Sequence, residues 1–123
     1  MPWNLDSDRP IFVQIVERIE KQILSGKYQP GDKLPSVRDL AMEAAVNPNT
    51  MQKALSELER SGLLYTQRTS GRFITEDQNM INQLKKNLAK ETIENFLLQM
   101  QDIGFSKEET LSIMSETIEG EKE

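Results

Sequence analysis

The stretch from Asn47 to Gly62 reads NPNTMQKALSELERSG and carries the signals of a complete short helix. Asn47 is a favourable N-cap because its side chain can accept a hydrogen bond from a first-turn amide, and Pro48 follows where a missing N–H costs nothing. Gly62 can adopt the left-handed conformation in which many helices end. We therefore predict a helix from Asn47 to Ser61.

The two faces of this helix differ in chemistry. One face carries apolar residues at the i, i+3, i+4, i+7 spacing of a buried stripe, namely Met51, Ala54, Leu55 and Leu58. The first two turns of the other face carry Asn49, Thr50, Gln52 and Lys53, and the acidic Glu57 and Glu59 come later. Amide side chains can bind an adenine edge, and a helix N-terminus favours phosphate. The pattern favours a helix whose N-terminal half faces nucleic acid, and a merely solvated face is the alternative.

The residues before it predict the first helix of a helix-turn-helix. Ser36 begins a capping box with Asp39, and only a short connection leads from this helix to Asn47. Its apolar positions are Val37, Leu40, Ala41 and Ala44. Arg38 falls in its first turn, near a DNA backbone if the following helix enters a major groove. The alternative for Arg38 is an exposed side chain without a partner.

A further helix is expected upstream. Its apolar stripe consists of Ile11, Phe12, Ile15, Val16, Ile19 and Ile23. Asp8 is the expected N-cap and Gly26 the expected end. The following GKYQPGDK, residues 26–33, has the glycine spacing of a phosphate-binding loop but lacks the Lys and Ser/Thr that must follow, so a nucleotide site is excluded. Pro30-Gly31 indicates a turn between two helices instead.

Alternation and β-propensity predict a hairpin after the second helix of this pair. Its strands are expected at Leu63 to Gln67 and Arg72 to Thr75, with a turn at Thr69 to Gly71. Tyr65 and Phe73 are expected to pack on the helices. Such a hairpin would form the wing of a winged helix.

The charge of the chain is unevenly distributed. The formal net charge is -5, but residues 1–75 carry ten Lys and Arg against nine Asp and Glu, and the remainder carries five against eleven. The acidity therefore belongs to the C-terminal part, which should point away from DNA or contact another protein. Arg68 and Arg72 flank the predicted hairpin tip, from which they could reach the DNA backbone or minor groove.

Residues 76–123 predict two helices. The longer helix should stop at Gly104. It carries a stripe made up of Ile81, Leu84, Leu88, Thr92, Phe96, Met100 and Ile103, and Ile93 and Leu97 broaden this stripe. Ser106 and Glu109 form a second capping box before a helix that should end near Gly120, followed by a frayed end at Glu119 to Glu123. Because the shorter helix cannot cover the longer stripe, a second copy is the expected partner. The expected dimer contacts are Leu84, Leu88, Phe96, Leu97, Met100, Leu111 and Met114.

Composition excludes several classes of protein. The 123 residues include no cysteine and no histidine, which excludes disulfides, Ser-His triads and nearly all zinc sites. No apolar run approaches the ~20 residues that span a bilayer, and residues 1–5 have no leader pattern. We expect a cytoplasmic protein that needs no metal or cofactor and is not an enzyme.

Two segments, PGDKLPSVRDLA at residues 30–41 and VNPNTMQKALSELERSGLL at residues 46–64, resemble the winged-helix domain of the GntR family of bacterial regulators. The resemblance covers roughly residues 9–75. It implies DNA contacts from Arg38, Asn47, Asn49, Thr50, Gln52 and the wing tip. The sequence departs from the family where Thr69 replaces the first wing glycine and where Pro48 replaces a frequent arginine. The short helical tail resembles the YtrA branch, whose members are dimers and often control genes for ABC transporters.

Together these observations predict a mostly helical chain with one β-hairpin. A winged helix-turn-helix DNA-binding domain at residues 1–75 should precede a two-helix dimerisation or effector region at residues 76–123. The expected DNA-binding residues are Arg38, Asn47, Asn49, Thr50, Gln52, Lys53, Arg68, Gly71 and Arg72. The expected function is a homodimeric repressor that binds a palindromic operator in double-stranded DNA, with any small-molecule effector unidentified. The alternative is a protein–protein adaptor that works through its acidic half.

Overall fold

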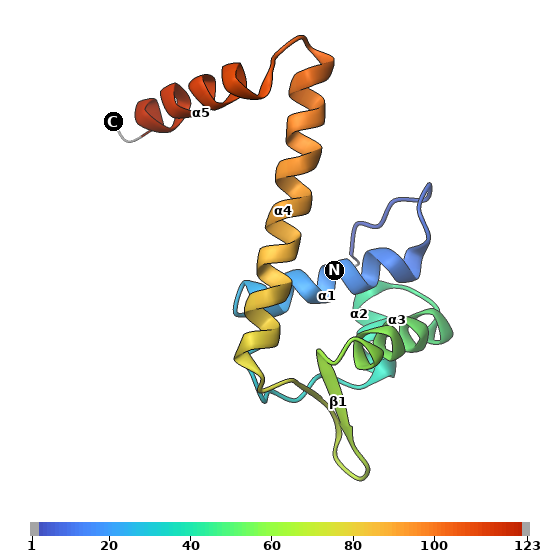
Figure 1. Cartoon of the computed structure of the whole chain (residues 1–123). Coiled ribbons are helices and arrows are strands. Elements are labelled where there is room, and N and C mark those ends of the chain that lie inside the picture. Colours follow the sequence, from blue (N-terminus) through green and yellow to red (C-terminus); the bar gives the residue numbers. More distant parts are fainter. Residues whose placement is uncertain (1–2, 122–123) are drawn as a thin grey trace. The chain divides into compact units, whose positions relative to one another are not determined.

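The computed structural model describes residues 3–121, whose helices and strands are shown in Figure 1. In chain order they are α1 (Ile11–Leu24), α2 (Val37–Ala44), α3 (Pro48–Arg60), β1 (Leu64–Gln67), β2 (Gly71–Ile74), α4 (Gln78–Asp102) and α5 (Lys107–Glu121). The chain divides into two compact units, the N-terminal unit (Met1–Gln83) and the C-terminal unit (Leu84–Glu123). The predicted architecture, a winged helix-turn-helix followed by two helices, is confirmed.

The core of the N-terminal unit forms around α3. The predicted stripe of Met51, Ala54, Leu55 and Leu58 is buried, and α3 packs against both α1 and α2. The buried apolar residues of these two helices are Ile15, Ile19 and Ile23 of α1, and Leu40, Ala41 and Ala44 of α2. The small alanines let the helices approach closely. The side chain of Asn47 caps α3 as predicted, accepting a hydrogen bond from the Asn49 amide at 2.7 Å.

The start of α1 differs from the prediction. Asp8 does not cap it; the helix begins after Pro10 without a side-chain cap. The buried side chain of Gln14 accepts a hydrogen bond from the Asp6 amide at 2.7 Å and donates to the carbonyl oxygens of Asp6 and Arg9 at 2.8 and 3.0 Å. Because Gln14 satisfies the polar groups of this loop, the loop folds back on α1 and Asp8 does not occupy the cap position.

The turn between α2 and α3 is closed by backbone geometry. Ser36 caps α2, accepting from the Asp39 amide at 3.1 Å. At the other end Ala45 adopts a left-handed conformation, φ 59°, and the Val46 amide donates to the Ala41 carbonyl oxygen at 3.0 Å. This pattern usually uses glycine, since a side chain disfavours positive φ.

The hairpin pairs Leu64 with Ile74 and Gln67 with Gly71. Tyr65 and Phe73, expected to pack on the helices, lie opposite each other in this register and stack with ring centroids 5.7 Å apart. The segment after the Pro30-Gly31 turn also lies along β2: Lys33 pairs with Phe73, and the Leu34 amide donates to the Arg72 carbonyl oxygen at 2.9 Å. This third paired segment supports a hairpin that otherwise has only two strands.

In the C-terminal unit, α4 leads into α5 through Gly104, φ 97°. The predicted capping box is present in both directions, from the Glu109 amide to Ser106 Oγ at 3.1 Å and from the Ser106 amide to Glu109 Oε1 at 3.0 Å. α5 ends at Glu121, within one residue of the predicted end near Gly120, because glycine permits a left-handed stop without imposing one. Glu119 to Glu121, predicted to be frayed, are helical. Residues 122–123 of the predicted frayed end lie outside the described residues.

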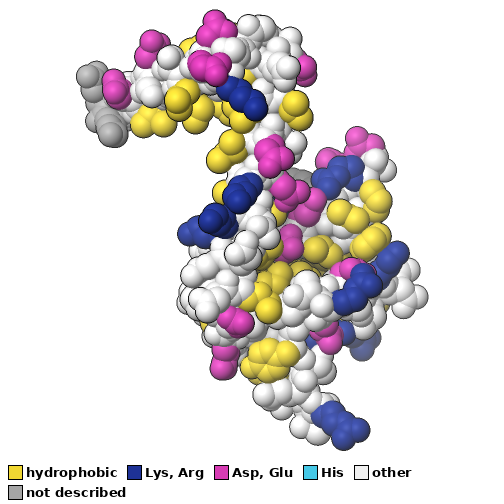
Figure 2. All heavy atoms as spheres, viewed as in Figure 1, with side chains coloured by type: hydrophobic (Ala, Val, Ile, Leu, Met, Phe, Trp, Pro, Cys, Tyr) yellow, Lys and Arg dark blue, Asp and Glu magenta, His cyan; other side chains and the backbone are white. Residues whose placement is uncertain are grey.

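Most apolar side chains of the C-terminal unit remain accessible in a single chain. Leu84, Leu88, Phe96, Leu97, Met100 and Met114 are half-buried, and Leu111 is 65% exposed. Ile93, Leu98, Ile103 and Ile118 are each more than half exposed. Figure 2 shows hydrophobic side chains gathered along one side of α5 and acidic ones along the other.

Trp3 is a core residue that the sequence patterns did not reveal. It is 6% exposed, its indole N–H donates to Glu43 Oε2 at 3.2 Å, and the Arg18 guanidinium lies 5.0 Å from its ring centroid. Its contacts therefore join the N-terminal segment to both α1 and α2.

We predict that Trp3→Ala lowers the free energy of unfolding by about 3–5 kcal/mol, as for other buried tryptophans. Trp3→Phe keeps a ring and should cost less. Urea unfolding measures both effects. It should be followed by circular dichroism and not by tryptophan fluorescence, because either change removes the single tryptophan. Equal stability of Trp3→Ala and wild type would contradict a core role for Trp3.

Candidate nucleic-acid interface

The buried stripe of α3 directs its predicted contact residues outward. Asn47, Asn49, Gln52 and Lys53 are exposed, and Thr50 is half-buried. Thr50 and Asn47 border a cavity of about 400 Å³ that Trp3 and Ile11 also line. Because the side-chain oxygen of Asn47 caps the helix, its NH₂ group is the part left to bind another molecule.

Two of these side chains have intramolecular contacts that the sequence did not predict. The ammonium group of Lys53 lies 4.0 Å from the ring centroid of Phe12 on α1. The Gln52 amide donates to Ser56 Oγ at 3.3 Å, a long bond that a better acceptor can replace. Lys53 is thus held toward α1, whereas Gln52 keeps a readily available amide.

The predicted arginines fall into two groups. Arg38, in the first turn of α2, and Arg68, in the hairpin loop, are exposed and have no ion-pair partner among residues 3–121. Figure 2 shows a basic side chain at the hairpin tip. Arg72, by contrast, forms an ion pair with Glu59 of α3, and only 19% of its side chain is exposed. Gly71 begins β2 with φ 109°.

Glu59, which the sequence places in the later turns of the polar face of α3, is a further residue of this site. Burial raises the pKa of its carboxyl, but hydrogen bonds from Arg72 and Thr66 outweigh burial and leave that pKa below its ordinary value. Thr66 and Arg72 face each other across the hairpin. One carboxylate at the end of α3 therefore binds both strands of the wing, a link with no periodic signature in the sequence.

The arrangement can hold a helix start and separate cations against an anionic polymer. Among the described residues, no three His, Cys, Asp or Glu side chains gather where they could hold a metal ion. No helix within residues 3–121 has the length and hydropathy needed to cross a membrane.

Comparison with known proteins identifies the same scaffold. Residues 12–74 match the bacterial regulatory proteins of the gntR family. The chain is 42% identical to the HTH-type transcriptional regulator YhcF of Bacillus subtilis, over 98% of this chain and 99% of that protein. It is 38% identical to the HTH-type transcriptional repressor YtrA of the same organism, over 83% of this chain and 79% of that protein.

Solved structures agree with these relatives. A GntR family transcriptional regulator from Listeria monocytogenes is 42% identical and superposes with a TM-score of 0.84, covering 91% of this chain and 98% of that one. AraR(DBD) in complex with operator ORX1 is 30% identical, with a TM-score of 0.52 over 61% of this chain and 92% of that one. The chain therefore belongs to the GntR family and is a DNA-binding transcriptional regulator, not an enzyme.

Proposed function

We propose that this regulator is a repressor that binds a two-fold symmetric operator as a homodimer. The observation that carries the proposal is the exposed, amide-rich start of α3, on a helix whose opposite stripe is buried. A helix held in this way can enter a major groove without losing its packing. The name of the relative YtrA, a transcriptional repressor, supports the sign of regulation.

The proposed roles divide between reading bases and positioning the protein. Asn49 and Gln52 offer amides to base edges, with Asn47 and Thr50 beside them. Arg38 and Arg68 contact backbone phosphates, and Lys53 adds charge next to the reading residues. Gly71 and Arg72 belong to the wing.

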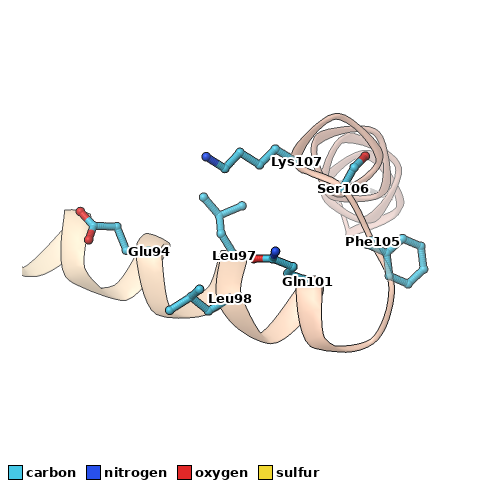
Figure 3. Close-up of a pocket in the computed structure, with 7 residues that line it drawn as sticks. All are labelled: Glu94, Leu97, Leu98, Gln101, Phe105, Ser106 and Lys107. Atoms are coloured by element: carbon cyan, nitrogen blue, oxygen red, sulfur yellow. The ribbon is translucent and has the colours of Figure 1, made fainter.

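The apolar surface of the C-terminal unit supports the homodimer. Soluble monomers rarely expose large contiguous apolar patches, and two-fold symmetry is the commonest way to bury one. Figure 3 shows Leu97 and Lys107 extending into the angle between α4 and α5, where the two helices leave a cavity of about 400 Å³ unfilled. We propose that a second copy covers this region through Leu84, Leu88, Phe96, Leu97, Met100, Leu111 and Met114.

Selection from a random duplex pool tests the operator. The expected result is an inverted repeat with half-sites about one DNA turn apart, or a multiple of it. Placed over a promoter, the selected site should make transcription in vitro fall as protein is added. Activation would contradict repression. Two results together would favour the adaptor alternative, acting through the acidic side of α5: no duplex is selected, and binding to duplex DNA does not depend on salt.

We predict that Asn49→Ala and Gln52→Ala each weaken operator binding by about 1–3 kcal/mol and relax base preference at particular positions. The reason is that each change removes an amide able to bind a base edge. Selection with each variant measures both effects. Unchanged affinity and unchanged selected sequences would show that the start of α3 does not read bases.

We predict that Arg38→Ala weakens binding to all duplexes alike. Loss of one phosphate contact should make the slope of log Kd against log salt shallower by about 0.9 for each half-site. Arg68→Ala, measured at the same salt, should have the smaller effect, because an exposed charge on a short loop contributes little. If Arg38→Ala lost affinity only for the selected operator, Arg38 would instead contact a base.

We predict that the double variant Leu111→Glu, Ile118→Glu is a folded monomer. Both side chains are more than half exposed in one chain, so the charges should disrupt the dimer and not the fold. Sedimentation should show the change of mass, and affinity for the inverted repeat should fall through lost bivalency. Ser112→Glu, exposed on the same helix, is the control and should remain dimeric. A monomeric wild type would refute the proposed homodimer.

A further inference from the structure

A groove in the N-terminal unit separates the start of α2 from the wing. Its volume is about 740 Å³, and its lining includes Lys33, Ser36 and Asp39 on one side and Ser70 and Arg72 on the other. The two sides are tied together at the backbone, where the Leu34 amide donates to the Arg72 carbonyl oxygen. The groove is thus part of the fold and not a gap between independent segments.

The side chain of Lys33 passes over the wing at Gly71, a residue without a side chain. A Cβ atom on Gly71 would lie 3.3 Å from Lys33 Cε, closer than ordinary contact, and Gly71 has a φ of 109° that side chains disfavour. Glycine at this position therefore leaves room for the lysine stem. This assigns Gly71 a packing role in addition to its place in the hairpin.

The charges of the groove leave Lys33 as its available cation. The Arg72 guanidinium is paired with Glu59, whereas Lys33 is exposed and has no ion pair among residues 3–121. Ser36 Oγ accepts from the Asp39 amide and keeps its own proton for donation. Asp39 is the carboxylate in the lining, so an anion in the groove should bind more tightly when that charge is removed.

We propose that this groove holds one backbone phosphate of bound duplex DNA, with Lys33 as its cationic contact and Ser36 and Ser70 as hydroxyl donors. Arg72 and Glu59 are positioning residues: their ion pair holds the wing in place, and the wing forms the far wall of the groove. This assignment rests on the proposed function, because it concerns the same DNA complex.

The first test is the salt dependence of binding to the duplex selected by wild-type protein. Lys33→Gln should reduce the ratio of Kd between 200 and 50 mM salt by about 3.5-fold per half-site, as one lost phosphate contact implies. Asp39→Asn should bind more tightly than wild type. Lys27→Gln removes an exposed lysine outside the groove and is the matched control. Equal effects of Lys33→Gln and Lys27→Gln would overturn the proposal.

The second test replaces single backbone phosphates of the duplex by neutral methylphosphonates. One replacement per half-site should weaken binding of wild type but not of Lys33→Gln, because the lysine and that phosphate form one contact. Identical profiles for both proteins would refute the assignment. If Arg38→Ala still flattens the salt dependence in that case, only the groove fails and the proposed function stands.

The third test separates positioning from contact. Glu59→Gln and Arg72→Gln should weaken binding while leaving the salt slope at its wild-type value, since neither removes a phosphate contact. The exchange Glu59→Arg, Arg72→Glu should restore part of the affinity. A slope reduced by about 0.9 per half-site for Arg72→Gln would make Arg72 itself the phosphate contact and overturn its positioning role.

Discussion

Burial of the α3 stripe is the constraint on which the rest of the N-terminal unit depends. Met51 and Leu55 are fully excluded from water, and each large apolar side chain buried in this way stabilises the fold by about 1.5–3 kcal/mol. Rotating α3 by one residue, about 100°, would expose this stripe and bury Gln52 or Lys53. The outward direction of the helix start is therefore a consequence of core packing and needs no contact with DNA to maintain it.

The wing is attached by a different kind of interaction. Two strands of four residues offer little apolar surface, and an isolated hairpin of this size is marginally stable in water. The chain supplements it with the edge pairing of Lys33 and with the Glu59 carboxylate bound to Arg72 and Thr66. Polar, partly buried links have strict geometry, so they orient the wing relative to α3 more narrowly than apolar contact alone would.

The charge distribution makes individual cations more important than the overall field. Residues 1–75 are nearly neutral, so their net charge by itself attracts the DNA backbone only weakly. Several of the basic side chains are also engaged internally, as Arg72 is with Glu59 and Lys53 is with Phe12. Arg38 and Lys33, which have no such partner within residues 3–121, are then expected to carry a larger share of the proposed phosphate binding.

The sequence by itself determined the helices, the N-caps of α2, α3 and α5, and the hairpin, because these depend on residues close along the chain. Asn47, Ser36 and Ser106 bind amides two or three residues away, and the apolar stripes repeat with the helical period. The candidate reading residues follow from the same pattern, since they lie opposite the α3 stripe.

Only the tertiary structure decided which polar and aromatic side chains meet across the fold. Trp3 binds Glu43, 40 residues away, and Glu59 binds Arg72, 13 residues away; neither pair leaves a periodic signal. Gln14 replaced the expected cap at Asp8 because a loop folded back on α1. The passage of Lys33 over Gly71 likewise requires two segments to be adjacent. Such contacts depend on how the elements pack, and that arrangement exists only once the core around α3 has formed.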